Sequence, residues 1–211
     1  MAPVRAQEKT KSATTNHESM SEYIKVLLSL LWGTLFLVWL LYALFSKKGT
    51  SSEPWHQRLL FNWMPLLLAF YLLGPGDWFG HTLIREKFVE HTNLVGIIGL
   101  IPCLLGLAIS IWSRLLLGTN WSLSVQKKEK HELIIRGPYK LVRHPIYTGL
   151  LLMFCGNALI VGDYRAIIAV LIVFVSFWFK LKKEEKLLTE VFGDNYREYM
   201  QKTKRMIPWL I

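Results

Sequence analysis

The sequence predicts an all-α integral membrane protein with about five transmembrane helices. Hydrophobic residues make up 52% of the 211 residues and charged residues only 19%, whereas soluble domains have about 25% charged residues. Several apolar segments are long enough to cross a bilayer, and basic residues gather between them. The length fits a single domain, which we place at residues 23–211.

The N-terminal region divides into a polar tail and an apolar segment. Residues 1–22 are rich in Ala, Thr, Ser, Lys and Glu and have no apolar period, which predicts a disordered tail. The apolar segment from Tyr23 to Phe45 is longer than the hydrophobic region of a signal peptide. We therefore expect a transmembrane helix that is retained.

Four further apolar segments follow, at residues 59–73, 93–117, 146–161 and 165–179. Each is interpreted as a membrane-spanning helix. Only residues 162–164 separate the last two, so these segments are expected to form a tight helical hairpin.

Small residues mark one face of the segment 93–117. Gly99, Cys103, Gly106 and Ser110 recur at helical spacing along it. Small side chains at such positions let a neighbouring helix approach closely in lipid. The stripe therefore predicts a close helix-to-helix contact, although small residues also fall in such patterns by chance.

The net charge of +10 is better explained by contact with anionic membrane lipid than with nucleic acid. The sequence lacks the base-reading and stacking motifs of nucleic-acid-binding proteins. Its two cysteines, Cys103 and Cys155, lie in apolar segments without CxxC spacing. They indicate neither a disulfide scaffold nor a structural zinc site, and we expect no bound metal.

The basic residues also predict an orientation in the membrane. They gather between the first and second spans, between the third and fourth, and in the C-terminal tail. If the chain crosses the membrane five times, these three regions lie on the same side of the membrane. The positive-inside rule predicts that this side is the cytoplasmic one. We therefore expect the N-terminus outside the cytoplasm and the C-terminus inside it.

The long loop before the fourth span carries the first candidate site feature. Pro145 begins the helix at a position where its missing N–H costs nothing. The first helical turn directs backbone N–H groups towards the loop, with Arg143 and His144 beside them, which favours an anion at this place. The alternative is that Arg143 and His144 anchor the helix end to lipid headgroups.

The end of the fifth span carries the second feature. The helix continues past Phe179, so Lys180 and Glu184 share one face. Residues 185–202 are expected to form an amphipathic helix, interrupted near Gly193. Glu184 and Glu185 are either part of a site or a solvated helix face. A basic helix start near an acidic helix end would fit a zwitterionic ligand.

At these residues the sequence resembles the isoprenylcysteine carboxyl methyltransferase family. The matching blocks run from Gln126 to the region of Pro208. They are His131-x-Leu133-Ile134-x-x-Gly137-x-Tyr139, Arg143-His144-Pro145-x-Tyr147-x-Gly149, Glu184-Glu185-x-x-Leu188 and Phe192-Gly193-Asp194-x-Tyr196-x-x-Tyr199. Membrane phospholipid N-methyltransferases share part of this pattern.

The resemblance implies a cytoplasmic S-adenosylmethionine site formed by the loop before the fourth helix and the C-terminal helix. The cofactor-binding residues that it implies are Gln126, His131, Leu133, Ile134, Tyr139, His144, Pro145, Tyr147 and Glu184. Arg143 and Glu184 are the implied catalytic residues. The family's substrate-facing arginine corresponds to Lys180, which keeps the charge but lacks the bidentate fork that binds a carboxylate.

The activity that the resemblance implies is methyl transfer to the carboxylate of an isoprenylated cysteine or a similar lipophilic acid entering from the bilayer. Such a carboxylate, with a pKa of about 3.5, is already ionised and needs no general base. Two alternatives stay open at this stage. One is N-methylation of a phospholipid or another lipophilic amine, and the other is a non-catalytic membrane protein that binds anionic lipid.

Overall fold

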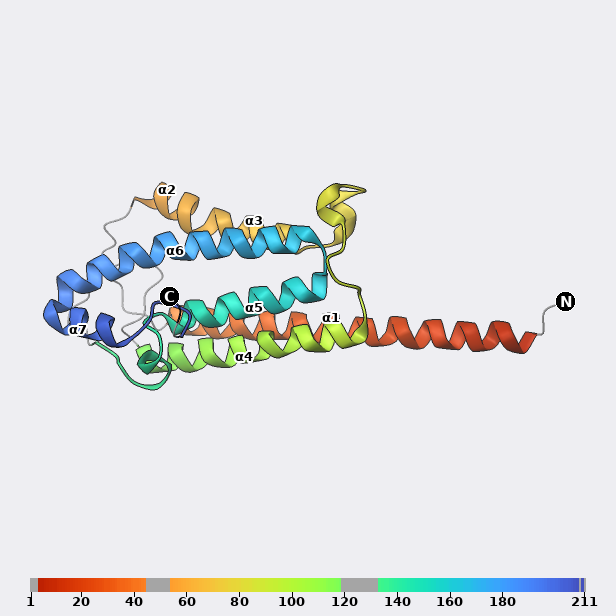
Figure 1. Ribbon diagram of the computed structural model, residues 1–211, viewed down its shortest axis with the longest axis horizontal. Helices are drawn as coiled ribbons and strands as arrows, with labels where there is room; N and C mark the ends of the chain where they lie inside the picture. Colours follow the sequence, from red (N-terminus) through yellow and green to blue (C-terminus); the bar gives the residue numbers. More distant parts are fainter. Residues whose placement is uncertain (1–3, 45–53, 119–132, 209, 211) are drawn as a thin grey trace.

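The computed structural model describes residues 4–44, 54–118, 133–208 and 210. Within these ranges the chain forms helices and no β-strand, which confirms the all-α prediction. The helices are α1 (Val4–Leu44), α2 (Trp55–Arg58), α3 (Met64–Leu72), α4 (Asn93–Leu117), α5 (Pro145–Val161), α6 (Tyr164–Phe192) and α7 (Asp194–Lys202). Shorter helical turns are η1 (Leu59–Trp63), η2 (Gly76–Phe79), η3 (Leu83–Arg85) and η5 (Gly137–Lys140). The long helices run side by side in one bundle (Figure 1).

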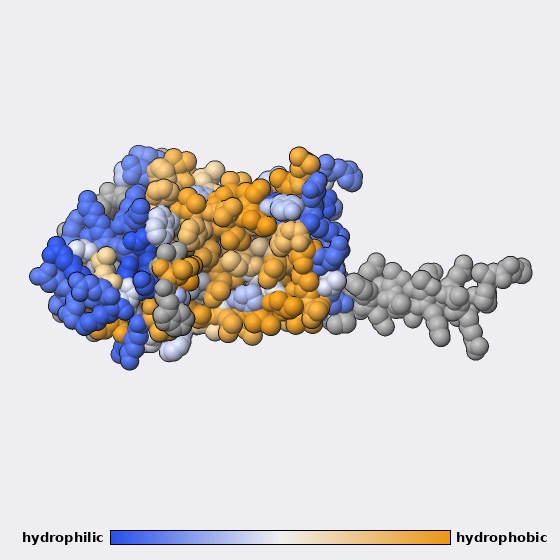
Figure 2. Space-filling view, viewed as in Figure 1, coloured by the Kyte–Doolittle hydropathy of each residue, from blue (hydrophilic) through white to orange (hydrophobic). Residues whose placement is uncertain are grey.

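On the face that Figure 2 shows, an apolar belt covers the middle of the bundle, and polar residues lie towards both of its ends. Leucines in the belt are exposed, for example Leu37 at 57% and Leu104 at 58%. Three helices are long and apolar enough to cross a membrane, at Glu22–Leu44, Asn93–Leu117 and Tyr164–Phe192. The other two predicted segments are also helical, but shorter, at Leu59–Leu72 and Pro145–Val161. The protein is an integral membrane protein.

The N-terminal region differs from the sequence prediction of a disordered tail over residues 1–22, because α1 begins at Val4. This region includes alanine, glutamate and lysine, which favour helix. Because the region is continuous with an apolar helix, its extension needs no new helix nucleus.

Helices α4 and α5 pack through glycines. A Cβ atom added to Gly149 would lie 2.5 Å from the carbonyl oxygen of Gly106, and one added to Gly106 would collide with the carbonyl oxygen of Gly149. Gly99 and Gly156 repeat this arrangement two turns away, where a Cβ atom added to Gly99 would lie 2.8 Å from the carbonyl oxygen of Gly156. Larger residues at these four positions would therefore prevent the two helices from approaching so closely. The predicted contact through the stripe of small residues is therefore confirmed.

The turn between α5 and α6 is the predicted tight hairpin. Gly162 ends α5 with φ of +71°, a backbone conformation that favours glycine. Arg165 is buried and donates to both carboxylate oxygens of Asp163, at 2.9 and 2.7 Å. It also donates to the carbonyl oxygens of Leu72 and Gly74, at 2.9 and 2.6 Å. The hairpin is thus tied to the end of α3.

Aromatic rings fill the space between α1, α3 and α5. The Trp32 and Phe154 ring centroids are 5.1 Å apart, and Phe70 lies 4.9 Å from Trp32 and 5.2 Å from Phe154. These separations are typical of stabilising aromatic pairs.

Helix α6 continues well beyond the segment 165–179 and ends at Phe192. Gly193, with φ of +57°, separates it from α7. The predicted amphipathic helix with an interruption near Gly193 is thereby confirmed. Helix α7, the C-terminal segment, the end of α4 and the start of α5 all lie at the same end of the bundle (Figure 1).

Candidate active site

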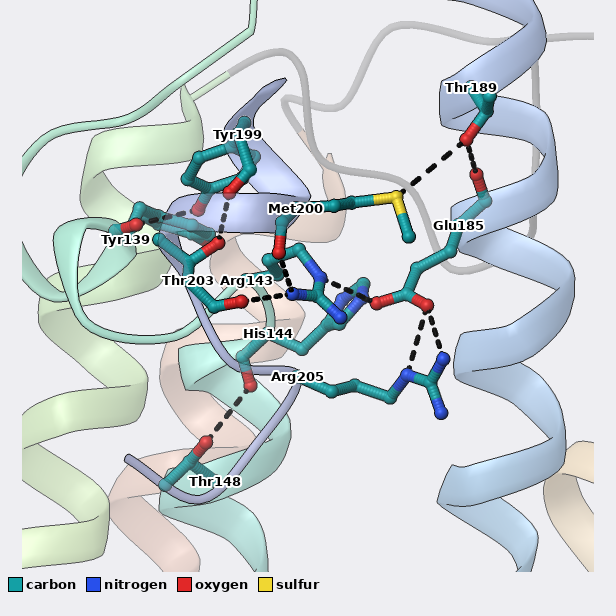
Figure 3. A network of polar contacts seen from close by, with 10 residues as sticks. All are labelled: Tyr139, Arg143, His144, Thr148, Glu185, Thr189, Tyr199, Met200, Thr203 and Arg205. Carbon is teal, nitrogen blue, oxygen red and sulfur yellow. Dashed lines mark hydrogen bonds and ion pairs between the residues drawn. The ribbon is translucent and has the colours of Figure 1, made fainter. Parts of the chain in front are cut away.

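A buried carboxylate, Glu185, lies at the centre of a polar network at this end of the bundle (Figure 3). Its Oε1 accepts a hydrogen bond from Arg143 Nε at 2.7 Å. Its Oε2 accepts two from Arg205, from Nε at 2.9 Å and Nη2 at 2.6 Å. His144 Nε2 lies 3.4 Å from Oε1. Two guanidinium groups on one carboxylate favour its ionised form.

Arg143 connects this carboxylate to the C-terminal segment. Its Nη1 donates to the carbonyl oxygens of Met200, at 3.2 Å, and Thr203. The arginine side chain is 9% exposed. Its observed contacts are therefore internal, and they position the segment after α7 against α6.

The C-terminal segment also pairs with the residues just before α5. The backbone N–H of Arg143 donates to Lys204 O at 2.8 Å, and that of His144 to Arg205 O at 3.0 Å. Thr148 Oγ1 donates to Met206 O at 2.6 Å. The sequence analysis expected an anion beside Arg143 and His144. Among the described residues, the anion in contact with both side chains is the carboxylate of Glu185.

Two buried tyrosines connect the loop before α5 with α7. Tyr199 Oη donates to Tyr139 O at 2.6 Å, and Tyr139 Oη donates to Ser113 O at 3.4 Å. Burial raises the pKa of the Tyr139 phenol well above its usual value, and the negative charge of Glu184 raises it further. Burial also raises the pKa of Tyr199. Both phenols are neutral at physiological pH.

Glu184 and Glu185 have different environments. Glu185 is 4% exposed and continues a line of buried α6 residues at four-residue spacing, Val173, Phe177 and Leu181. Glu184 is half-buried and close enough to Tyr139 to affect its pKa. The structure therefore brings Glu184 to the predicted cofactor residues, whereas Glu185 is the carboxylate that pairs with Arg143.

Lys180 lies on α6, one helical turn before Glu184. Its Nζ is 5.5 Å from the centroid of the Tyr147 ring. The Tyr147 ring in turn packs edge-on against Phe177, with 4.9 Å between centroids. Lys180 and Tyr147 line a cavity of about 360 Å³ between α1, η1, α3, α5 and α6. Its other walls are mostly apolar and include Trp32.

The remaining predicted residues are placed as follows. Ile134 and Pro145 are buried, and Leu133 is half-buried. Gln126 and His131 lie outside the described residues. The contacts of Tyr139 with Tyr199 and of Arg143 with Glu185 thus bring together described residues of all four motif blocks.

The sequence analysis selected Glu184 from the pair Glu184 and Glu185 for the implied site, and it did not consider Arg205. The four-residue spacing of apolar residues on α6 could have identified Glu185 as the inward-facing carboxylate. Arg205 has no such local signal, because its partner lies on another element 20 residues earlier.

Comparison with known proteins shows which proteins this chain is similar to. Residues 94–195 match the family model described as phospholipid methyltransferase. This region includes α4, the loop, α5, α6 and the start of α7, and therefore Arg143 and Glu185. The part of the chain that carries the network around Glu185 is therefore similar to phospholipid methyltransferases.

Individual relatives are similar to parts of the chain. A probable protein-S-isoprenylcysteine O-methyltransferase of Oryza sativa subsp. indica is 29% identical over 119 residues, which is 55% of this chain and 62% of the relative. Methanethiol S-methyltransferase 1 of Bradyrhizobium diazoefficiens is 37% identical over 71 residues, 34% of this chain and 24% of that protein. The chain thus spans less than two thirds of the length of these relatives.

A solved structure shares the fold. The eukaryotic intramembrane Ras methyltransferase, an isoprenylcysteine carboxyl methyltransferase, superposes with a TM-score of 0.52 at 23% sequence identity. The match covers 75% of this chain and 54% of that one. The chain is thus similar in sequence to a protein-S-isoprenylcysteine O-methyltransferase over 55% of its length, and it shares the fold of this solved structure.

Proposed function

We propose that the protein transfers a methyl group from S-adenosylmethionine to the carboxylate of an isoprenylated cysteine or a similar lipophilic acid. The observation that carries this proposal is the mostly apolar cavity of about 360 Å³ within the bundle. Lys180 and Tyr147 line it close to Glu184. An apolar tail would occupy the cavity while its acidic end meets the cation.

The residues beside the cavity fit the proposed cofactor. S-adenosylmethionine supplies a methyl group activated by a sulfonium cation. Tyr139 and Tyr147 offer aromatic rings, and each such ring attracts a cation by roughly 0.5–2 kcal/mol. Glu184 offers a carboxylate for the same cation or for a hydroxyl group of the cofactor. In this proposal Gln126 and His131 of the preceding loop complete the cofactor site.

Lys180 is the proposed acceptor-binding residue. Its ammonium group would bind the ionised carboxylate of the acceptor and direct one oxygen towards the methyl group. Because Glu184 follows Lys180 by one turn of α6, one rigid helix would carry both the cofactor side and the acceptor side. Such alignment of two reactants contributes up to roughly 7–11 kcal/mol to catalysis.

Arg143 is assigned a positioning role in this proposal, because its observed contacts are all internal. It joins Glu185 to the carbonyl oxygens of Met200 and Thr203. The C-terminal segment, in turn, bonds to the residues that begin α5. Fixing this start also fixes His144 and Tyr147, which the proposal places beside the cofactor.

A second candidate function is the N-methylation of a phospholipid or another lipophilic amine. The family model, which describes phospholipid methyltransferases, favours it. An ammonium group must lose a proton before it attacks the methyl group, so this reaction needs a base and a rate that rises with pH. The charge of Lys180 would oppose a protonated amine in the cavity.

Methyl-labelled S-adenosylmethionine distinguishes the two functions. Detergent-purified protein is incubated separately with a farnesylated N-acetylcysteine, phosphatidylethanolamine and a small thiol. We expect label on the farnesylated acid, and release of this label by mild base identifies a methyl ester. Base-stable label on the phospholipid supports amine methylation. Transfer to the thiol alone, or to none of the acceptors, contradicts the proposal.

We further propose that the end of the bundle with α7 faces the cytoplasm and that the N-terminus lies on the opposite side. The distribution of Lys and Arg supports this orientation. Single cysteines introduced at position 128 and within residues 4–21, in a chain whose two native cysteines are replaced, should react with an impermeant maleimide from opposite sides. Labelling of both from the same side contradicts the orientation.

A further inference from the structure

A basic groove of about 460 Å³ lies between the loop before α5 and the C-terminal segment. Five cationic residues line it: Lys140, Arg143, Lys202, Lys204 and Arg205. No acidic residue is among the residues that line it. We use the name "basic groove" for this site below.

The cations of the basic groove exceed the carboxylates around them. Glu185 binds Arg143 and Arg205, and Glu198 binds Lys202 at 2.5 Å. Lys140 and Lys204 are exposed, and neither has an ionic partner within the part of the chain that the structure describes. The groove therefore has an excess of positive charge, which favours an anionic ligand.

The apolar residues of the groove place it at the edge of the apolar belt. Trp178 lines the groove on α6 and is followed by the lysines at 180, 182 and 183, where the helix becomes polar. Tryptophan is enriched at the boundary between hydrocarbon and headgroups. Leu141 and Leu210, also in the groove, are 59% and 69% exposed. Figure 2 shows this boundary between apolar and polar surface near the end of the bundle.

The guanidinium group of Arg205 has a fixed orientation beside the groove. Its Cζ lies 4.5 Å above the Trp178 ring. Its Nε and Nη2 donate to Glu185, and Nη1 takes part in neither bond. An oriented guanidinium is suited to bind a phosphate group.

We propose that the basic groove binds the phosphodiester headgroup of an anionic phospholipid from the adjoining leaflet. The two exposed lysines and Arg205 would contact the phosphate, and the acyl chains would extend past Leu141 and Leu210 into the bilayer. A soluble anion would use the cations but not this apolar edge. Binding also joins Lys140 in the loop before α5 to Lys204, so it stabilises the C-terminal segment in its observed position. The proposal is independent of methyl transfer.

Lipid retention by the whole 211-residue chain tests the proposal. Detergent-purified protein is titrated with phosphatidylglycerol or phosphatidylcholine, and bound lipid is measured by native mass spectrometry. Wild-type protein should retain phosphatidylglycerol in preference to phosphatidylcholine. Each lysine at a membrane surface contributes a factor of about five to the affinity for anionic lipid. The double substitution Lys140→Gln and Lys204→Gln should therefore weaken phosphatidylglycerol binding by about thirtyfold.

A charge-matched control separates a site from general attraction. Lys87→Gln with Lys186→Gln also removes two positive charges, but neither residue lines the groove. It should change the affinity less than twofold. Equal weakening by both double variants, or no weakening by Lys140→Gln with Lys204→Gln, overturns the proposal. Displacement of the lipid by millimolar inorganic phosphate would show a soluble-anion site and also overturns it.

Discussion

Replacing Glu185 by Gln tests whether the buried carboxylate holds the C-terminal segment in place. Three hydrogen bonds from Arg143 and Arg205 end on its two oxygens. Removing one partner of a buried ion pair costs about 3–5 kcal/mol, because the other charge stays buried. Arg205 is 18% exposed and can be partly rehydrated, so we expect the lower value, about 3 kcal/mol. For a chain of this size that lowers the unfolding midpoint by about 6–12 °C.

The assay is thermal unfolding of the purified protein in detergent, with Glu184→Gln as the matched control. Glu184 is half-buried, and the structure gives it no ion pair within the described ranges. Its replacement should cost less than about 0.5 kcal/mol. Both variants replace a glutamate by glutamine, at neighbouring positions of α6. The difference between their unfolding midpoints therefore measures the contribution of the hydrogen bonds that Glu185 accepts from Arg143 and Arg205.

A double-mutant cycle identifies the partner. With Arg143→Met in the same chain, Glu185→Gln should cost much less than it does alone, because the buried arginine charge is then gone. Equal midpoints for Glu185→Gln and Glu184→Gln, or fully additive losses in the cycle, would refute the reasoning that Glu185 connects α6 to the C-terminal segment.

Three further predictions concern the cofactor, the acceptor and the packing of the helices. S-adenosylmethionine is expected to bind with an affinity in the micromolar range, and His144→Ala and Glu184→Ala should each weaken this binding. Calorimetry on folded variants measures the affinity, and an unchanged affinity in both variants would remove these residues from the site. Lys180→Met should lower kcat/KM for a lipophilic acid about ten- to a hundredfold, because the contact with the acceptor carboxylate is worth about 1.5–3 kcal/mol. Lys180→Arg should keep or raise kcat/KM. An unchanged kcat/KM in Lys180→Met would contradict the proposed role of Lys180 in binding the acceptor. Gly106→Ala should destabilise the protein by about 1–3 kcal/mol, because its Cβ would meet Gly149 O. Gly33→Ala, with open space around it, should be neutral or mildly stabilising, and similar unfolding midpoints for the two would contradict the close α4–α5 contact.

The helices could be predicted from the sequence because each depends on local features. Apolar length and helical spacing identified α4 with its exact bounds, and the break at Gly193 followed from a glycine within an amphipathic pattern. The stripe of small residues on α4 even indicated how it packs. The N-terminal part of α1 was not identified, because a polar composition alone does not show that a helix extends from an apolar neighbour.

The candidate site was only partly predictable, because its contacts join elements distant in sequence. Local spacing placed Lys180 and Glu184 on one face, but the choice between Glu184 and Glu185 as the partner of Arg143 depends on which way α6 faces in the bundle. The pairing of Lys204 O with the backbone of Arg143 joins residues about 60 positions apart. No pattern within either segment encodes such a contact.

The glycine contacts between α4 and α5 also determine where the bundle can change shape. Backbone meets backbone there, so the two helices cannot separate without losing close packing along their length, and densely packed interfaces compress little. The cavity is lined by α1, η1, α3, α5 and α6, with no residue from α4. Its walls on α1 and α3 are mostly aromatic and leucine side chains, which can change rotamer. The contact between α4 and α5 therefore holds one side of the bundle closed, and in the proposed function the apolar tail of the acceptor would enter the cavity past the side chains of α1 and α3.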